Sequence, residues 1–116
     1  MTKEQYLEKY IYNGLTNLNT GFDSPSIQYF SQTEFKILLE KVEEQNICIY
    51  GIEPFDSDLD YFDTKVYENY NKEANDPDWY NRAFEEFVSL GEELIYAASF
   101  HVPDELLKKN SDNLLF

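Results

Sequence analysis

Residues 31–45 place the firmest constraint on the fold, because local chemistry fixes where a helix begins. Ser31 is a favoured helix-capping residue, Glu34 completes a capping box three positions later, and Phe30 and Phe35 have the spacing of a hydrophobic staple. The apolar side chains that follow recur at intervals of three and four residues: Phe35, Leu38, Leu39 and Val42. This spacing predicts an amphipathic helix that ends near Gln45 and packs one face on a core.

Two short apolar segments are predicted to be strands. Residues 47–52 are rich in β-branched and aromatic side chains and are followed by Pro54, which we expect to end the strand. Residues 94–102 form a second such segment, which stops before Pro103. The two strands could pair in parallel across the helix between them, but the sequence does not fix the strand order.

The remaining segments give further helices and loops. Thr2 and Gln5 form a capping-box pattern, so a first helix is expected from residue 2 to about 17, with Asn13-Gly14 as an alternative earlier end. Residues 17–25 are rich in turn formers and predict a loop. Asp76-Pro77 and Gly91 are the start and stop signals of a third helix. Residues 64–70 fit a strand or a helical turn, and residues 104–110 a short last helix.

Together these segments predict an α+β protein with a small sheet of two to four strands, covered on one face by about three helices. Residues 1–116 are expected to form a single acidic globular domain, with 111–116 a frayed tail. Hydrophobic residues make up 42% of the chain, enough for a core without disulfides. Cys48 is the sole cysteine and is expected to be a small buried apolar residue.

Net charge carries the functional information. The chain has 23 acidic and 9 basic residues, a formal net charge of -14, and 13 of the acidic residues lie between Glu53 and Glu93. Such a field repels nucleic acid and anionic membranes but attracts and orients a basic protein. We therefore expect the protein to bind a basic protein partner, and to bind neither nucleic acid directly nor a membrane. The absence of a signal-peptide pattern and of disulfide pairs favours the cytoplasm.

Catalytic and metal-binding patterns are weak. One histidine and one cysteine cannot build the usual zinc sites, and His101 lies in an apolar segment without a nucleophile motif. Asp56, Asp58 and Asp60 have the spacing of a calcium loop, but Tyr61 occupies the position where that loop needs glycine. A solvated acidic loop is the plainer interpretation. We therefore expect a protein that is not an enzyme and that uses no cofactor and no metal.

The acidic window also holds many aromatic residues, and aromatic side chains ringed by carboxylates suit an interface with a basic protein. We expect Trp79 and Tyr80 among its aromatic anchors. The alternative is that the aromatics form the core and the acids only keep the protein soluble, although solubility requires a net charge of only about 2 to 8. The candidate partner-binding residues are Glu53, Asp56, Asp58, Asp60, Tyr61, Asp63, Glu68, Tyr70, Asp76 and Asp78.

Three sequence segments, residues 19–30, 49–54 and 96–100, carry a resemblance to a known family. In these segments the chain resembles the immunity proteins of bacterial contact-dependent growth inhibition and related polymorphic toxin systems. The resemblance implies a cytoplasmic protein that binds one cognate toxin domain, often a nuclease, as a monomer in a heterodimer. One alternative is a phage or mobile-element nucleic-acid mimic that inhibits a restriction or CRISPR nuclease. Another is a small carboxylate-dependent hydrolase, which would need a deep cleft holding two acidic groups.

Overall fold

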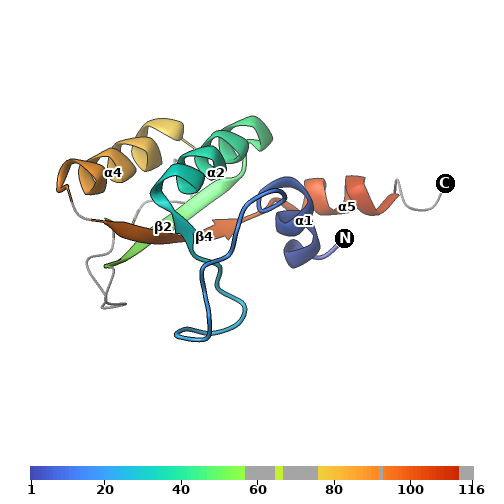
Figure 1. The fold of residues 1–116 in the computed structure, drawn as a ribbon. Coiled ribbons are helices and arrows are strands. Elements are labelled where there is room, and N and C mark those ends of the chain that lie inside the picture. Colours follow the sequence, from blue (N-terminus) through green and yellow to red (C-terminus); the bar gives the residue numbers. More distant parts are fainter. Residues whose placement is uncertain (57–64, 67–75, 92, 113–116) are drawn as a thin grey trace.

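A computed structural model describes residues 1–56, 65–66, 76–91 and 93–112 (Figure 1). The described strands form one antiparallel sheet in the order β1-β4-β2-β3. The predicted α+β class is confirmed. In chain order the elements are α1 (Lys3–Tyr10), β1 (Phe30–Ser31), α2 (Gln32–Gln45), β2 (Cys48–Asp56), β3 (Lys65–Val66), α4 (Pro77–Ser89), β4 (Leu94–His101) and α5 (Asp104–Asp112).

The pairing of β2 with β4 forms the centre of the sheet. It runs from Cys48 opposite His101 to Asp56 opposite Leu94, with a register shift between Ile49 and Gly51. The pairing is antiparallel, so the parallel arrangement considered from the sequence is wrong. A helix between two strands permits either direction, and no local signal decides between them.

Strand β2 continues past Pro54, where the sequence predicted its end. Pro54 lies opposite Tyr96 of β4, whereas the pairing with β3 involves only Gly51 and Ile52. Proline lacks a backbone N–H, and a strand tolerates it where no neighbouring strand needs that donor. Residues 64–70, whose sequence fits a strand or a helical turn, contain β3.

The predicted capping box of Thr2 and Gln5 is complete at the start of α1, whereas at the start of α2 only the Ser31 half of it is present. The Ser31 hydroxyl accepts a hydrogen bond from Glu34 N (3.3 Å). The Glu34 carboxylate accepts a hydrogen bond from Thr16 N (2.9 Å) and so holds the loop after α1 against α2. Helix α1 ends at Tyr10, well before residue 17, and Gly14 follows with φ +84°. Helix α1 therefore ends before both predicted ends, with Ile11 as its C-cap.

The two faces of the sheet are covered differently (Figure 1). Helices α2 and α4 lie side by side on one face and are called the helix layer below, while the segment between α1 and β1 lies on the other face. Helices α1 and α5 meet at one end, where the Met1 amino group donates to Leu107 O (3.4 Å). The outer surface of the helix layer therefore faces solvent on one side of the molecule.

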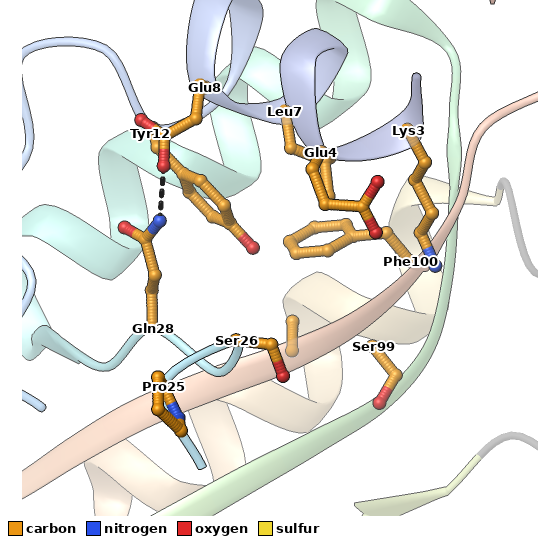
Figure 2. A pocket seen from close by; sticks show the side chains of 11 residues that line it. Lys3, Glu4, Leu7, Glu8, Tyr12, Pro25, Ser26, Gln28, Ser99 and Phe100 are labelled. Atoms are coloured by element: carbon orange, nitrogen blue, oxygen red, sulfur yellow. Dashed lines mark hydrogen bonds between the residues drawn. The ribbon is translucent and has the colours of Figure 1, made fainter. Parts of the chain in front are cut away.

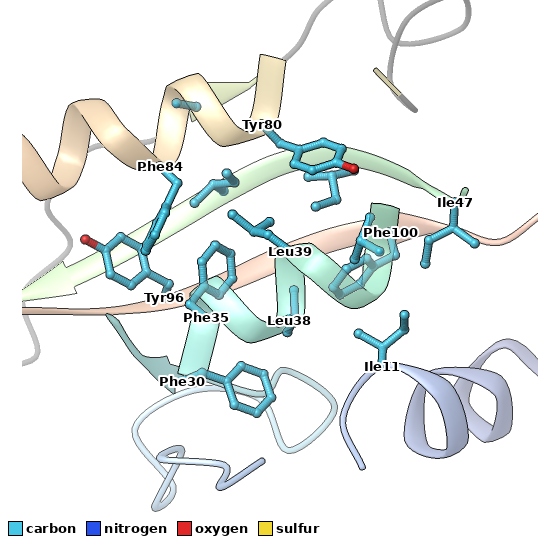
Figure 3. Close-up of a cluster of buried hydrophobic side chains, with 14 of the residues drawn as sticks. Ile11, Phe30, Phe35, Leu38, Leu39, Ile47, Tyr80, Phe84, Tyr96 and Phe100 are labelled. Carbon is cyan, nitrogen blue, oxygen red and sulfur yellow. The ribbon is translucent and has the colours of Figure 1, made fainter. Parts of the chain in front are cut away.

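Between the helix layer and the sheet lies an aromatic core (Figure 3). The ring of Tyr96 stacks on Phe35 at 5.1 Å and meets Phe84 edge-on at 5.1 Å. Tyr80 and Tyr96 are fully buried, and their hydroxyls find no hydrogen-bond partner among the described residues. Burial raises the pKa of Tyr96 to about 12. Both hydroxyls therefore lose their hydration on folding without compensation.

Tyr96→Phe is accordingly expected to raise the free energy of unfolding by about 1 kcal/mol, because the variant removes a desolvated hydroxyl and keeps the ring. Urea denaturation followed by circular dichroism measures the change. Tyr29→Phe is the matched control, since the Tyr29 hydroxyl donates to Asp23 Oδ2 (2.6 Å) and its loss is expected to lower stability. A loss of stability in Tyr96→Phe would show that the hydroxyl has a partner.

Candidate partner-binding surface

The outer surface of the helix layer is strongly acidic. Three basic side chains belong to its helices, and of these Lys41 donates to Asn13 O, while Lys36 and Arg82 are exposed. The exposed acidic residues of the two helices and of the α4 cap are Glu40, Glu43, Glu44, Asp76, Asp78, Glu85 and Glu86. The carboxylates outnumber the basic groups, so this surface presents a negative field to an approaching molecule.

Helices α2 and α4 run antiparallel, and a groove of about 450 Å³ lies between them. It begins where the start of α2 meets the second half of α4, and its exposed surface is mainly apolar. The lining residues are Gln32, Thr33 and Lys36 from α2, and Asn81, Phe84, Glu85, Val88 and Ser89 from α4. The acidic surface therefore contains an apolar depression.

At the other end of the helix layer, the last turn of α2 meets the first turn of α4. The buried Tyr80 ring marks this junction: burial raises the pKa of its hydroxyl, and the nearby charges of Glu43 and Asp76 raise it further. Asp76 caps α4, and its Oδ1 accepts a hydrogen bond from Asp78 N (2.9 Å). Carboxylates from both helices thus gather at this end.

The structure brings together only some of the predicted site residues. Asp76 and Asp78 lie in the first turn of α4, and Asp56 is the last residue of β2. Glu53 lies opposite Ala97. The next pair along the two strands, Pro54 and Tyr96, faces the helix layer. Because side chains alternate along a strand, Glu53 faces the opposite side of the sheet. Six predicted residues lie outside the described residues: Asp58, Asp60, Tyr61, Asp63, Glu68 and Tyr70.

Glu53 belongs to a local cluster on that opposite side. Partial burial raises the pKa of Glu53, and the charge of Asp23 raises it further. The pKa of Asp23 is lowered, because its carboxylate accepts from the Tyr29 hydroxyl (2.6 Å) and from Ser24 N (2.7 Å). Tyr29 packs on the Phe55 ring at 5.0 Å. Glu53 is therefore held beneath the segment that precedes β1, away from the helix layer.

Glu53→Gln is expected to raise the free energy of unfolding at pH 7, by less than about 1 kcal/mol because water still reaches the group. The pKa of Glu53 is higher in the folded than in the unfolded chain, so its charged form destabilises the fold above the folded pKa. Below the unfolded pKa both states are protonated and the difference should vanish. Thermal unfolding across pH 3–8 measures it, with exposed Glu44→Gln as control. A pH-independent difference would contradict this origin.

Two aromatic residues of the acidic window are not the exposed anchors that the sequence suggested. Tyr80 is fully buried in the core, so its prediction as an anchor is wrong. Trp79 is half-buried, and its Nε1 donates to Ile49 O (3.2 Å), which ties α4 to β2. Cys48 is also half-buried, and burial raises the pKa of its thiol.

Sequence reasoning missed the acidic residues of α2, because they precede the window in which acids are most frequent. Glu40 and Glu43 lie off the apolar stripe that α2 buries, and this signal predicts that they face solvent. Only the antiparallel packing of α2 and α4 brings Glu43 to the same junction as Asp76, at Tyr80. The candidate surface is therefore assembled from two segments that are distant in the sequence.

A second groove, of about 390 Å³, lies between α1, the segment of Pro25 to Gln28, and β4 (Figure 2). Lys3, Glu4 and Glu8 line it from α1, and Gln28 donates a hydrogen bond to Glu8 (2.5 Å). Charges of both signs meet in this groove, as Lys36 and Glu85 do in the groove of the helix layer. Neither of these two grooves is lined by the Asp23–Glu53 pair.

Among residues 1–56, 65–66, 76–91 and 93–112, no three histidine, cysteine or acidic side chains are grouped to hold a metal ion. Within the same residues, no helix combines the length and apolar character needed to cross a membrane. Comparisons with protein-family models, with curated proteins and with solved structures give no match to this chain. The function is therefore inferred from the geometry and charge of the chain itself.

Proposed function

We propose that this protein is an immunity protein that binds and blocks a cognate basic toxin domain, with a nuclease as the leading candidate. The observation that carries the proposal is the acidic outer surface of the helix layer on a chain whose net charge is -14. In this proposal the protein acts in the cytoplasm, as a monomer in a one-to-one complex.

The chemistry of a nuclease explains why such a surface would inhibit it. A protein that binds nucleic acid places lysine and arginine against the phosphates, and carboxylates on an inhibitor compete for the same positive groups. Opposite charges speed the encounter and fix the orientation of the two proteins. Glu40, Glu43 and Glu85 on adjacent helices offer several carboxylates at once to one basic surface.

Solubility alone is a poor explanation of this arrangement. A net charge of about 2 to 8 keeps a small domain soluble, and this chain exceeds that range. The helix layer also combines its carboxylates with the apolar groove at Phe84 and Val88. Protein interfaces commonly join an apolar centre to a polar rim, which this surface reproduces in outline.

Co-expression in a bacterial host tests the proposal, with the product of the reading frame immediately upstream as the partner. That product alone should arrest growth, and this protein should restore growth and copurify with it in a one-to-one complex. An unrelated protein of similar net charge serves as control and should give no rescue. Normal growth of cells that make the upstream product without this protein would overturn the proposal.

A further inference from the structure

We propose that the groove between α2 and α4 receives an amphipathic helix of the basic partner. An apolar residue of that helix would enter the groove over Phe84 and Val88, and its lysine or arginine residues would contact Glu40, Glu43 and Glu85. This inference deepens the proposed function and rests on it, since it assigns the part of the partner that the acidic surface recognises.

The apolar end of the groove is built on the core. Phe84 is 6% exposed, and Figure 3 shows its side chain directed from α4 toward Tyr96 and Phe35. Val88 follows one turn later and is half-buried. On α2, Ile37 lies four residues after Thr33 and is 40% exposed, so apolar surface continues on that side of the groove. A side chain bound here would rest on rigid, packed residues.

The seam between α2 and α4, which contains the groove at one end, is long enough for a short helix. Helices of 14 and 13 residues are about 20 Å long, so an antiparallel pair offers a seam for about three to four turns of a third helix. Insertion of an amphipathic helix into a groove between helices is a common mode of peptide recognition. The cavity of about 450 Å³ holds one or two large apolar side chains.

The charges along the seam between α2 and α4 favour a basic helix as the occupant. Glu40 and Glu43 lie four and seven residues after Lys36, on the helix stripe that borders the groove, and Glu85 lines it from α4. Lys36 is the one basic residue among the groove-lining side chains. The seam is therefore apolar near Phe84 and acidic toward the end of α2. A helix with an apolar turn followed by basic turns complements both parts.

Nuclear magnetic resonance titration tests the inference with synthetic probes. The first probe is a 16-residue peptide with leucine on one helical face and lysine elsewhere, and the second has the same composition in scrambled order. The first should bind at least about tenfold more tightly. Its strongest amide shifts should lie at Lys36, Phe84 and Val88. Equal affinity of the two peptides, or shifts centred elsewhere, would overturn the inference.

Val88→Lys should weaken binding of the amphipathic peptide at least about tenfold, because it places a cation in the groove, and should leave the scrambled peptide little affected. The exposed groove residue Thr33→Arg is the second variant and should have the same effect even if Val88→Lys does not fold. Shifts at the groove that grow with protein concentration without peptide would assign it to a second copy of this chain and overturn the inference.

Binding of the upstream product distinguishes failure of the groove assignment from failure of the proposed function. If that product binds Thr33→Arg as tightly as the unaltered chain, the groove assignment fails and the proposed function stands. If the peptide occupies the groove and the upstream product does not bind at all, the proposed function fails, and the groove is left as a site for a basic amphipathic helix of another protein.

Discussion

Phe35→Ala is expected to lower the free energy of unfolding by about 3–5 kcal/mol, which is a large part of the stability of a small domain. Phe35 is fully buried, and its ring packs against Tyr96 at 5.1 Å and Phe84 at 5.4 Å. Its removal leaves a cavity where α2, α4 and β4 meet. Chemical denaturation at pH 7 measures the loss.

Ile37→Ala is the matched control, because Ile37 lies two residues away on the same helix and is 40% exposed. Its expected loss is below about 1 kcal/mol. Phe35→Leu retains part of the buried volume and should fall between the two, which keeps the test informative if Phe35→Ala does not fold. A loss below about 1 kcal/mol in Phe35→Ala would place this ring outside the core.

Reversal of three carboxylates on the helix layer, Glu40→Lys, Glu43→Lys and Glu85→Lys together, is expected to raise the Kd for the upstream product at least about 100-fold. Lysines at these positions would face the positive groups of the partner, and like charges brought together at an interface cost several kcal/mol. Isothermal titration calorimetry at low salt measures the change.

The matched control reverses three exposed carboxylates at the other end of the molecule, Glu4, Glu8 and Glu105. It changes the net charge by the same amount, so a smaller loss of affinity would show that position matters as well as total charge. Equal losses in the two triple variants would place the interface outside the helix layer, or would make attraction between the proteins a property of net charge alone.

The fold could be predicted where the chain carries its own local signals. Ser31 and Asp76 begin helices because their side chains accept the backbone N–H groups that a helix leaves unpaired. Asn46 and Gly91 follow the ends of the same helices with positive φ. The strand segments were recognised from their apolar side chains. All of these signals act within a few residues.

Strand pairing depends on contacts between distant residues, so the sequence did not decide it. The antiparallel pairing of β2 with β4 and the continuation of β2 through Pro54 both depend on which strand lies beside which edge. The two-residue strand β1 was not predicted, because it exists only through its pairing with Ile95 and Tyr96. A strand of two residues is too short to show a recognisable sequence pattern.

The candidate surface was predictable in character but not in position. An excess of carboxylates indicated a basic partner, and that expectation remains a proposal. Strand alternation, however, turns Glu53 away from the helix layer, and helix packing brings Glu43 of α2 to the junction at Tyr80 that Asp76 also reaches. Residues that are close in the sequence therefore do not all lie on one surface, because the fold determines which side chains meet.

The affinity of this protein for the purified upstream product, measured at about 0.1 M and about 1 M salt, is the sharpest test of the claim that the acidic helix layer binds a basic toxin. Charges are screened over about 10 Å at the lower concentration and about 3 Å at the higher one. If carboxylates of the helix layer meet basic groups of a toxin, a one-to-one complex should form at low salt and its Kd should rise at least about tenfold at high salt. Absence of a complex at low salt, or an affinity that salt leaves unchanged, would contradict the claim.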